Sequence, residues 1–125
     1  MRSGVFRRYY KVKVVSKTDV LGDYKFAICY ENCEGLKGYV TEKIFDCMLS
    51  GCISIYWGAE NVLNYISSKC FIDRRNFKDE QSLYDFFKSI NAITFNTYQE
   101  KIAAFIDSQS AKKFYIEIML KKSHL

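Results

Sequence analysis

The segment from Tyr24 to Trp57, YKFAICYENCEGLKGYVTEKIFDCMLSGCISIYW, constrains the fold more than any other part of this chain. Two apolar, β-rich runs enclose a glycine-bearing loop and an amphipathic stretch with helical spacing. Such runs are typical of parallel strands that are buried on both faces and joined by a crossover helix. The segment therefore predicts an α/β unit with a loop and a helix start at the carboxyl end of a strand, where α/β proteins bind nucleotides.

The remaining patterns extend this unit to a whole domain. We expect strands at Lys25–Tyr30 and Cys52–Tyr56, with a helix between them from about Val40 to Ser50 that Gly51 ends as a C-cap. The polar stretch Lys17–Asp23 is expected to form a short helix or turn. A third short strand at residues 70–73 and three helices in the last third of the chain complete the prediction. Residues 1–125 are thus predicted to form one three-layer α/β/α domain with a mostly parallel sheet.

Composition limits the classes of partner. Apolar residues make up 49% of the chain, so it is expected to be globular, and the net charge of +5 suits anionic partners. Ten Tyr and ten Phe are a heavy aromatic load, and rings left exposed would need a partner domain or a second copy to cover them. The basic residues cluster at the two chain ends without a binding-motif spacing, so we expect no nucleic acid. No apolar run is long enough to span a bilayer.

The five cysteines are odd in number and mostly lie in apolar runs, which favours reduced thiols in the core and a reducing compartment. Their spacing matches no zinc finger and His124 is the only histidine, so no metal site is expected. We expect a cytoplasmic location in a bacterium. The Golgi lumen is the alternative if a membrane anchor precedes this sequence.

The motif GYVTEK, residues 38–43, carries the candidate chemistry. Lys43 lies in the first turn of the expected helix, where unpaired backbone N–H groups also gather, and it can reach a diphosphate. Glu42 is suited to accept hydrogen bonds from the two hydroxyl groups of a ribose. Tyr39 can offer its hydroxyl or its ring face to the same ligand. The alternative is structural: Thr41 is an N-cap, Glu42 complements the helix dipole and Lys43 is solvated.

A family resemblance bears on this choice. The segments YKFAICYEN, GYVTEKIFDC, GCISIYWGAEN and FIDRRNF occur in an order and spacing that resembles the GDP-fucose-dependent α-1,3/4-fucosyltransferases of the GT10 type. The resemblance covers about residues 11–77, and it is weaker through AKKFYIE. It implies the Rossmann-like, C-terminal, donor-binding domain of a two-domain GT-B glycosyltransferase, with the N-terminal acceptor domain absent from this sequence.

The resemblance also implies roles for particular residues. The donor contacts of the family fall on Asn32, Tyr39, Glu42 and Lys43, with Glu42 on the ribose and Lys43 on the diphosphate. The implied reaction transfers fucose from GDP-fucose to the GlcNAc or glucose of a glycan acceptor, with inversion and without a metal or other cofactor. The general base is expected in the missing domain, so no catalytic residue is assigned and the fragment alone is expected to be inactive. The alternative is a degenerate, non-catalytic domain that serves assembly with a partner chain.

Five positions near the expected site need separate expectations. The family usually has Pro where Ser54 stands, and the buried hydroxyl of Ser54 then needs a hydrogen-bond partner. The family often has Pro where Glu60 stands, and we expect the Glu60 carboxylate to face water. Trp57 either lines the donor pocket or packs in the core. Arg74 and Arg75 are expected at the surface or paired with Asp73.

Overall fold

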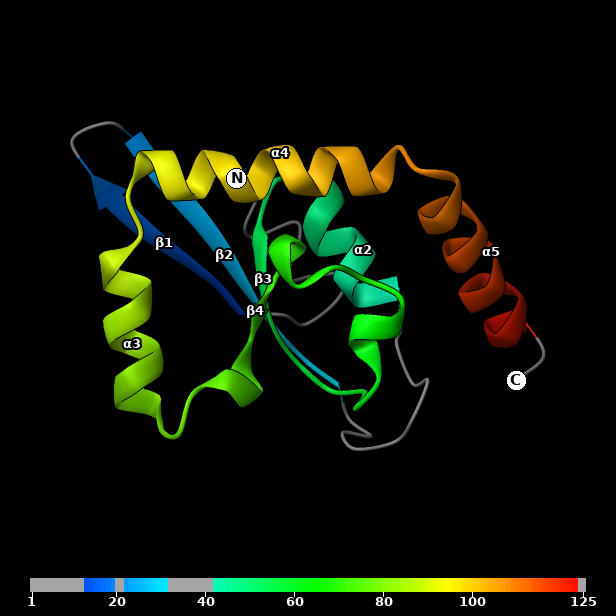
Figure 1. Ribbon diagram of the computed structural model, residues 1–125, viewed down its shortest axis with the longest axis horizontal. Helices are drawn as coiled ribbons and strands as arrows, with labels where there is room; N and C mark the ends of the chain where they lie inside the picture. The colour runs from blue at the N-terminus through cyan, green and yellow to red at the C-terminus, as the bar shows by residue number, and fades with distance from the viewer. Residues whose placement is uncertain (1–12, 20–21, 32–41, 124–125) are drawn as a thin grey trace.

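The computed structural model describes residues 13–19, 22–31 and 42–123, and its centre is one four-stranded sheet in the order β1-β2-β3-β4 (Figure 1). Strand β1 (Lys13–Asp19) is an edge strand that pairs antiparallel with β2 (Gly22–Tyr30). Strands β2, β3 (Ile53–Trp57) and β4 (Ile72–Asp73) are parallel neighbours. The predicted α/β fold with a mostly parallel sheet is confirmed.

The two central strands form where the sequence is apolar without interruption. In β3 the first four residues are buried and Trp57 is half-buried, and in β2 both Phe26 and Ala27 are fully buried although they point to opposite faces. The predicted strands at Lys25–Tyr30 and Cys52–Tyr56 are confirmed, with small shifts at their ends. Consecutive apolar residues were the right signal because helices cover both faces of this sheet.

The expectation of a helix or turn at Lys17–Asp23 is wrong, since β1 extends to Asp19 and β2 begins at Gly22. The polar residues fit an edge strand that has one solvent-facing side. Lys17 is directed at the end of helix α3 (Glu80–Ser89), where its ammonium group donates to the carbonyl oxygens of Phe87, Lys88 and Ile90. A lysine at the carbonyl end of a helix satisfies acceptors that have no partner within the helix.

Helix α2 (Glu42–Leu49) connects the two parallel strands β2 and β3. It ends as predicted at Gly51, whose φ of +87° lies in the left-handed region. The N–H of Cys52 donates to the carbonyl of Cys47 at 3.1 Å, and the N–H of Gly51 donates to that of Met48 at 3.2 Å. These two bonds form a Schellman motif, which ends the helix and turns the chain into β3.

Helices pack on both faces of the sheet and so make the three layers. On one face, the ring of Phe26 meets Phe87 of α3 and Phe95 of α4 (Ala92–Ile106), with centroids 4.7 Å and 5.8 Å apart. On the opposite face, Cys29 of β2 meets Cys47 of α2. The predicted α/β/α arrangement therefore follows from the alternation of side chains along β2.

Helix α4 runs along the top of the molecule in Figure 1, from the end of α3 to the start of α5 (Gln109–Ser123). Its Gln99 side chain donates to the carbonyl of Gly51, just before β3, at 2.9 Å. The Cys70 thiol, just before β4, donates to the carbonyl of Lys101 at 3.5 Å. Helix α4 thus lies along the amino ends of the parallel strands, and Phe45 of α2 packs between Phe105 of α4 and Tyr115 of α5.

Short helices fill the connections after β3. The 3-10 turns η1 (Val62–Asn64), η2 (Ser68–Cys70) and η3 (Arg74–Asn76) flank the two-residue strand β4. Helix α3 then begins at a capping box in which the Asp79 carboxylate accepts from the Ser82 N–H at 2.8 Å. The last three helices confirm the predicted elements, and α3 starts two residues before the expected Ser82.

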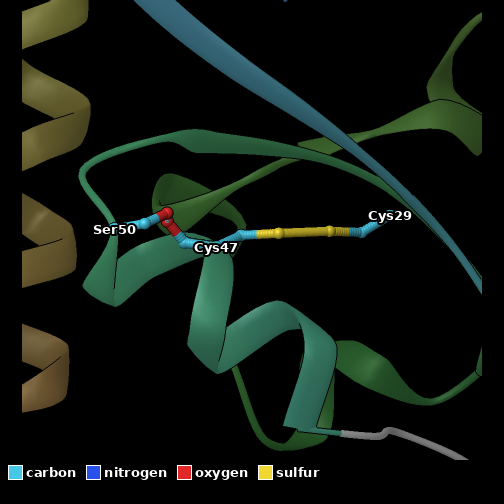
Figure 2. Close-up of a disulfide and its surroundings, with 3 residues drawn as sticks. All are labelled: Cys29, Cys47 and Ser50. Atoms are coloured by element: carbon cyan, nitrogen blue, oxygen red, sulfur yellow. Dashed lines mark hydrogen bonds between the residues drawn. A yellow bond between two sulfur atoms is a disulfide. The ribbon is translucent and has the colours of Figure 1, made fainter. Parts of the chain in front are cut away.

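The cysteines correct one expectation. Cys29 and Cys47 are joined by a disulfide that links β2 to α2, and Figure 2 shows the bond together with Ser50, whose hydroxyl donates to the Cys47 carbonyl at 2.9 Å. The prediction that these two thiols are reduced is wrong, because their side chains face each other across the strand–helix interface. Cys52 and Cys70 are buried thiols that take no part in a disulfide among the described residues, as predicted. Cys33 lies outside the described residues.

Candidate functional site

The carboxyl ends of β2, β3 and β4 lie side by side at one edge of the sheet. Tyr30 pairs with Trp57, and Tyr56 pairs with Asp73, so each strand ends next to its neighbour. Helix α2 crosses from the carboxyl end of β2 back to the amino end of β3, so its own N-terminus is at this same edge. In open α/β sheets this edge is where ligands bind, and here the N–H groups of a helix start also face it.

The structure describes only part of the predicted donor site. Glu42 is the first described residue of α2, and Lys43 follows it and is half-buried. Asn32, Tyr39 and Thr41 lie outside the described residues, and so does the side chain of Glu42. The donor-binding roles predicted for Asn32, Tyr39, Glu42 and Lys43 therefore stay predictions.

An ordered polar network that the sequence did not reveal lies at the same edge. Glu31 follows β2 and is only 5% exposed, and its N–H donates to the carbonyl of Trp57 at 2.8 Å. The hydroxyl of Tyr56 bonds with the Glu31 carboxylate and accepts from the N–H of Ala59 at 3.2 Å. Burial, more than any other cause, raises the pKa of Tyr56 far above its ordinary value, and the negative charge of Glu31 adds to this.

The arginine next to this network is paired as the sequence predicted. Arg75 makes a two-pronged contact with Asp73, with Nε to Oδ1 and Nη2 to Oδ2 both at 3.1 Å. Its Nη1 also donates to the carbonyl of Glu60 at 3.0 Å. The hydrogen bond to Asp73 is the main cause that raises the pKa of Arg75. The guanidinium of Arg75 therefore holds the loop after β3 against the end of β4.

Arg74 lies over an aromatic pair instead of projecting into water. Its guanidinium is 5.5 Å from the ring centroid of Trp57, and Trp57 meets Tyr30 edge to face at 5.6 Å. Arg74 also donates to the Phe77 carbonyl at 2.8 Å and to Glu80 at 3.3 Å. Burial, followed by the charge of Glu80, raises the pKa of Tyr30. Trp57 is half-buried at the strand end, and its role in the donor pocket or in the core stays a prediction.

Two departures from the family pattern have different outcomes. The Ser54 side chain is fully buried, and its hydroxyl finds no hydrogen-bond partner within the described part of the chain. The Glu60 side chain is exposed, as expected.

In the ranges that the structure describes, no group of three or more His, Cys, Asp or Glu side chains is arranged to hold a metal ion. Over the same ranges, no helix has both the length and the apolar character needed to cross a membrane.

Known proteins resemble this chain in sequence and in fold. The bacterial "Alpha-(1,3)-fucosyltransferase FucT" of Helicobacter pylori is 38% identical over 88 residues, which are 70% of this chain and 18% of that protein. The "Alpha-(1,4)-fucosyltransferase" of Arabidopsis thaliana is 36% identical over 70 residues, which are 56% of this chain and 17% of that protein. A "Crystal Structure of alpha1,3-Fucosyltransferase with GDP-fucose" superposes with a TM-score of 0.50 at 36% identity, over 60% of this chain and 22% of that one.

The chain thus spans about a fifth of the length of these relatives. Residues 5–116 match the profile described as "Glycosyltransferase family 10 (fucosyltransferase) C-term", which is nearly the whole sequence. The order of motifs, the carboxyl-edge helix start and this match agree, and the chain belongs to the C-terminal domain of glycosyltransferase family 10, the fucosyltransferases.

Proposed function

We propose that this chain is the GDP-fucose-binding domain of an α-1,3/4-fucosyltransferase. The observation that carries the proposal is the start of α2 at the carboxyl edge of the parallel strands, in a chain that matches the family over residues 5–116. A solved relative with 36% identity is described with GDP-fucose, which supports the same donor here. The net charge of +5 is consistent with an anionic nucleotide.

In this proposal the residues act through simple chemistry. The ammonium group of Lys43 and the N–H groups at the start of α2 hold the diphosphate, and Glu42 accepts hydrogen bonds from the ribose hydroxyls. Asn32 and Tyr39 complete the donor pocket. Positive charge and helix ends take the place of a bridging metal ion, so no cofactor is needed.

The reaction itself needs a second domain. A carboxylate in the acceptor domain removes the proton of the acceptor hydroxyl, whose oxygen attacks the anomeric carbon and inverts it while GDP leaves. Lys43 and the helix N-terminus stabilise the negative charge that grows on the leaving diphosphate. The acceptor is the GlcNAc or glucose of a glycan. Residues 1–125 supply the donor half of this reaction, and without the base they bind the donor but do not transfer fucose.

The cellular location stays a prediction. The expectation of a reducing, cytoplasmic compartment rested partly on reduced thiols, and the disulfide between Cys29 and Cys47 removes that support for two of the five cysteines.

Titration of the 125-residue chain with GDP tests the proposal. Trp57 is the only tryptophan and lies half-buried at the carboxyl edge, so its fluorescence reports binding there. We expect saturable binding of GDP, weaker binding of UDP, and a loss of about tenfold or more for Lys43→Ala, because a hydrogen bond to a charged group contributes about 1.5–3 kcal/mol.

Lys69→Ala is the matched control. It removes the same charge from an exposed lysine in η2, before β4 and close to helix α4. We expect its GDP affinity to equal that of the wild type. Absence of any fluorescence or amide-shift response to millimolar GDP would overturn the proposal and favour a non-catalytic assembly domain. Equal losses for Lys43→Ala and Lys69→Ala would remove Lys43 from the site.

A further inference from the structure

Glu31 is a carboxylate in an unusual place, and its burial requires an explanation. It is the first residue after β2, it is 5% exposed, and it is one of three buried polar or charged residues in the described part of the chain. A buried carboxylate is costly unless other groups satisfy it, and an apolar residue of similar size would usually pack at least as well. Its presence at the ligand-binding edge of the sheet therefore points to a role beyond packing.

The contacts of Glu31 connect two strand ends at two points. The first is the backbone bond to Trp57 at 2.8 Å, which continues the β2–β3 ladder by one residue. The second is the bond between the Glu31 carboxylate and the hydroxyl of Tyr56. That hydroxyl also accepts from the N–H of Ala59, so the carboxylate is connected through Tyr56 to the turn that follows β3.

Gly58 leaves the space that this arrangement needs. A Cβ atom at position 58 would lie 2.6 Å from the Tyr56 hydroxyl and 2.9 Å from Cβ of Glu31, and it would overlap Cγ of Glu31 as well. The Cβ of Glu31 is fixed by its backbone, and its Cγ can move only by a change of the χ1 rotamer, so an alanine at position 58 must displace the glutamate side chain or shift the backbone. The glycine is therefore required here by the glutamate, since any larger residue would displace it.

We infer that Glu31 is a positioning residue for donor binding, which fixes the end of β2 against the Trp57–Ala59 turn through Tyr56 and Gly58. The inference rests on the proposed function. The backbone ladder holds β2 beside β3, and the side-chain bond through Tyr56 also ties the end of β2 to the turn that follows β3. The chain that leaves Glu31 leads to the predicted donor contacts, so this connection sets the geometry of the nucleotide site.

Variants of the whole chain separate this role from a purely structural one. Glu31→Ala and Tyr56→Phe each remove one end of the side-chain bond, and Gly58→Ala displaces the glutamate while leaving both groups present. Glu31→Gln keeps an oxygen that accepts from Tyr56. Ser54→Ala is the control. It changes a fully buried polar residue on β3, the strand that also carries Tyr56, and the Ser54 hydroxyl has no described partner. GDP affinity is measured by Trp57 fluorescence, on protein whose folded state is checked by circular dichroism and urea unfolding.

We expect GDP affinity to fall about tenfold in Glu31→Ala, Tyr56→Phe and Gly58→Ala, and to stay within about twofold of the wild type in Glu31→Gln and Ser54→Ala. The double variant Glu31→Ala/Tyr56→Phe should bind no more weakly than Glu31→Ala, since both remove the same bond. Should Glu31→Ala fail to fold, Tyr56→Phe decides alone, because its ring stays packed.

Wild-type affinity in folded Tyr56→Phe and Gly58→Ala would overturn the inference while leaving the proposed function intact. A loss in Glu31→Gln as large as in Glu31→Ala would also overturn it, since charge and not position would then be the cause. Absence of GDP binding by the wild type would instead refute the proposed function.

Discussion

Replacement of Gly51 by alanine isolates the cost of a backbone conformation. Gly51 has a φ of +87°, and a Cβ atom built there meets no atom within 4 Å. The substitution therefore creates no clash, and the two hydrogen bonds of the Schellman motif, from Gly51 and Cys52, remain possible. The only change in the folded state is a side chain on a left-handed residue.

The expected loss of stability follows from the backbone conformation alone, because the added side chain makes no clash. A residue with a Cβ in the left-handed region costs about 1–2 kcal/mol, and alanine also restricts the unfolded chain, which returns about 0.4–1 kcal/mol. We expect Gly51→Ala to lower the free energy of unfolding by about 1 kcal/mol. Gly51→Asn should lose clearly less, because asparagine tolerates this conformation.

Urea unfolding followed by circular dichroism measures both variants. For a slope of about 1–2 kcal/mol per molar urea, a loss of about 1 kcal/mol lowers the midpoint by about 0.5–1 M at unchanged slope. Equal midpoints for wild type and Gly51→Ala would refute the assignment of a left-handed cap. An equal loss for Gly51→Asn and Gly51→Ala would show that the cost does not arise from backbone conformation.

Two further predictions concern the carboxyl edge. Arg75→Ala removes the guanidinium that pairs with the Asp73 carboxylate, which is only 7% exposed. We expect the free energy of unfolding to fall by about 2–3 kcal/mol, which is less than for a fully buried pair because the Arg75 side chain is 31% exposed. The double variant Asp73→Asn/Arg75→Ala should be more stable than Arg75→Ala, and a double variant that is less stable would contradict the explanation. Burial raises the pKa of Tyr56 above that of an unfolded tyrosine, so its contribution to stability is complete below about pH 10 and is lost as pH rises further. Between about pH 10 and 12, unfolding measurements should show stability falling less steeply in Tyr56→Phe than in the wild type, whereas parallel pH profiles would argue against a buried hydroxyl.

The sequence predicted those elements whose causes are local. The apolar runs in β2 and β3 and the glycine after α2 each carry their own signal, so the strands and the helix end could be located without the fold. The stretch from Lys17 was misread because its polar residues suit a turn as well as an edge strand, and only the position of β1 beside β2 decides between them. Local patterns do not contain that information.

The parts of the site that escaped prediction depend on contacts between distant residues. Glu31 and Tyr56 are 25 positions apart in the printed sequence, and no spacing rule connects a strand-end glutamate to a tyrosine in the next strand. Cys29 and Cys47 meet only after α2 has folded back on β2. A buried acidic residue at the end of an apolar strand, followed by a glycine at the end of the next one, is the signal that could have been used. The pairing of Arg75 with Asp73 was predictable because the two residues are near neighbours.

The disulfide between Cys29 and Cys47 has a topological consequence. With a sequence separation of 18, it closes a covalent ring that contains Asn32, Tyr39, Glu42 and Lys43 together. The disulfide joins the two ends of this ring, Cys29 in strand β2 and Cys47 in helix α2. The four residues proposed to bind the nucleotide therefore lie in one covalent ring. The disulfide lowers the conformational entropy of this ring in the unfolded chain, before any donor binds.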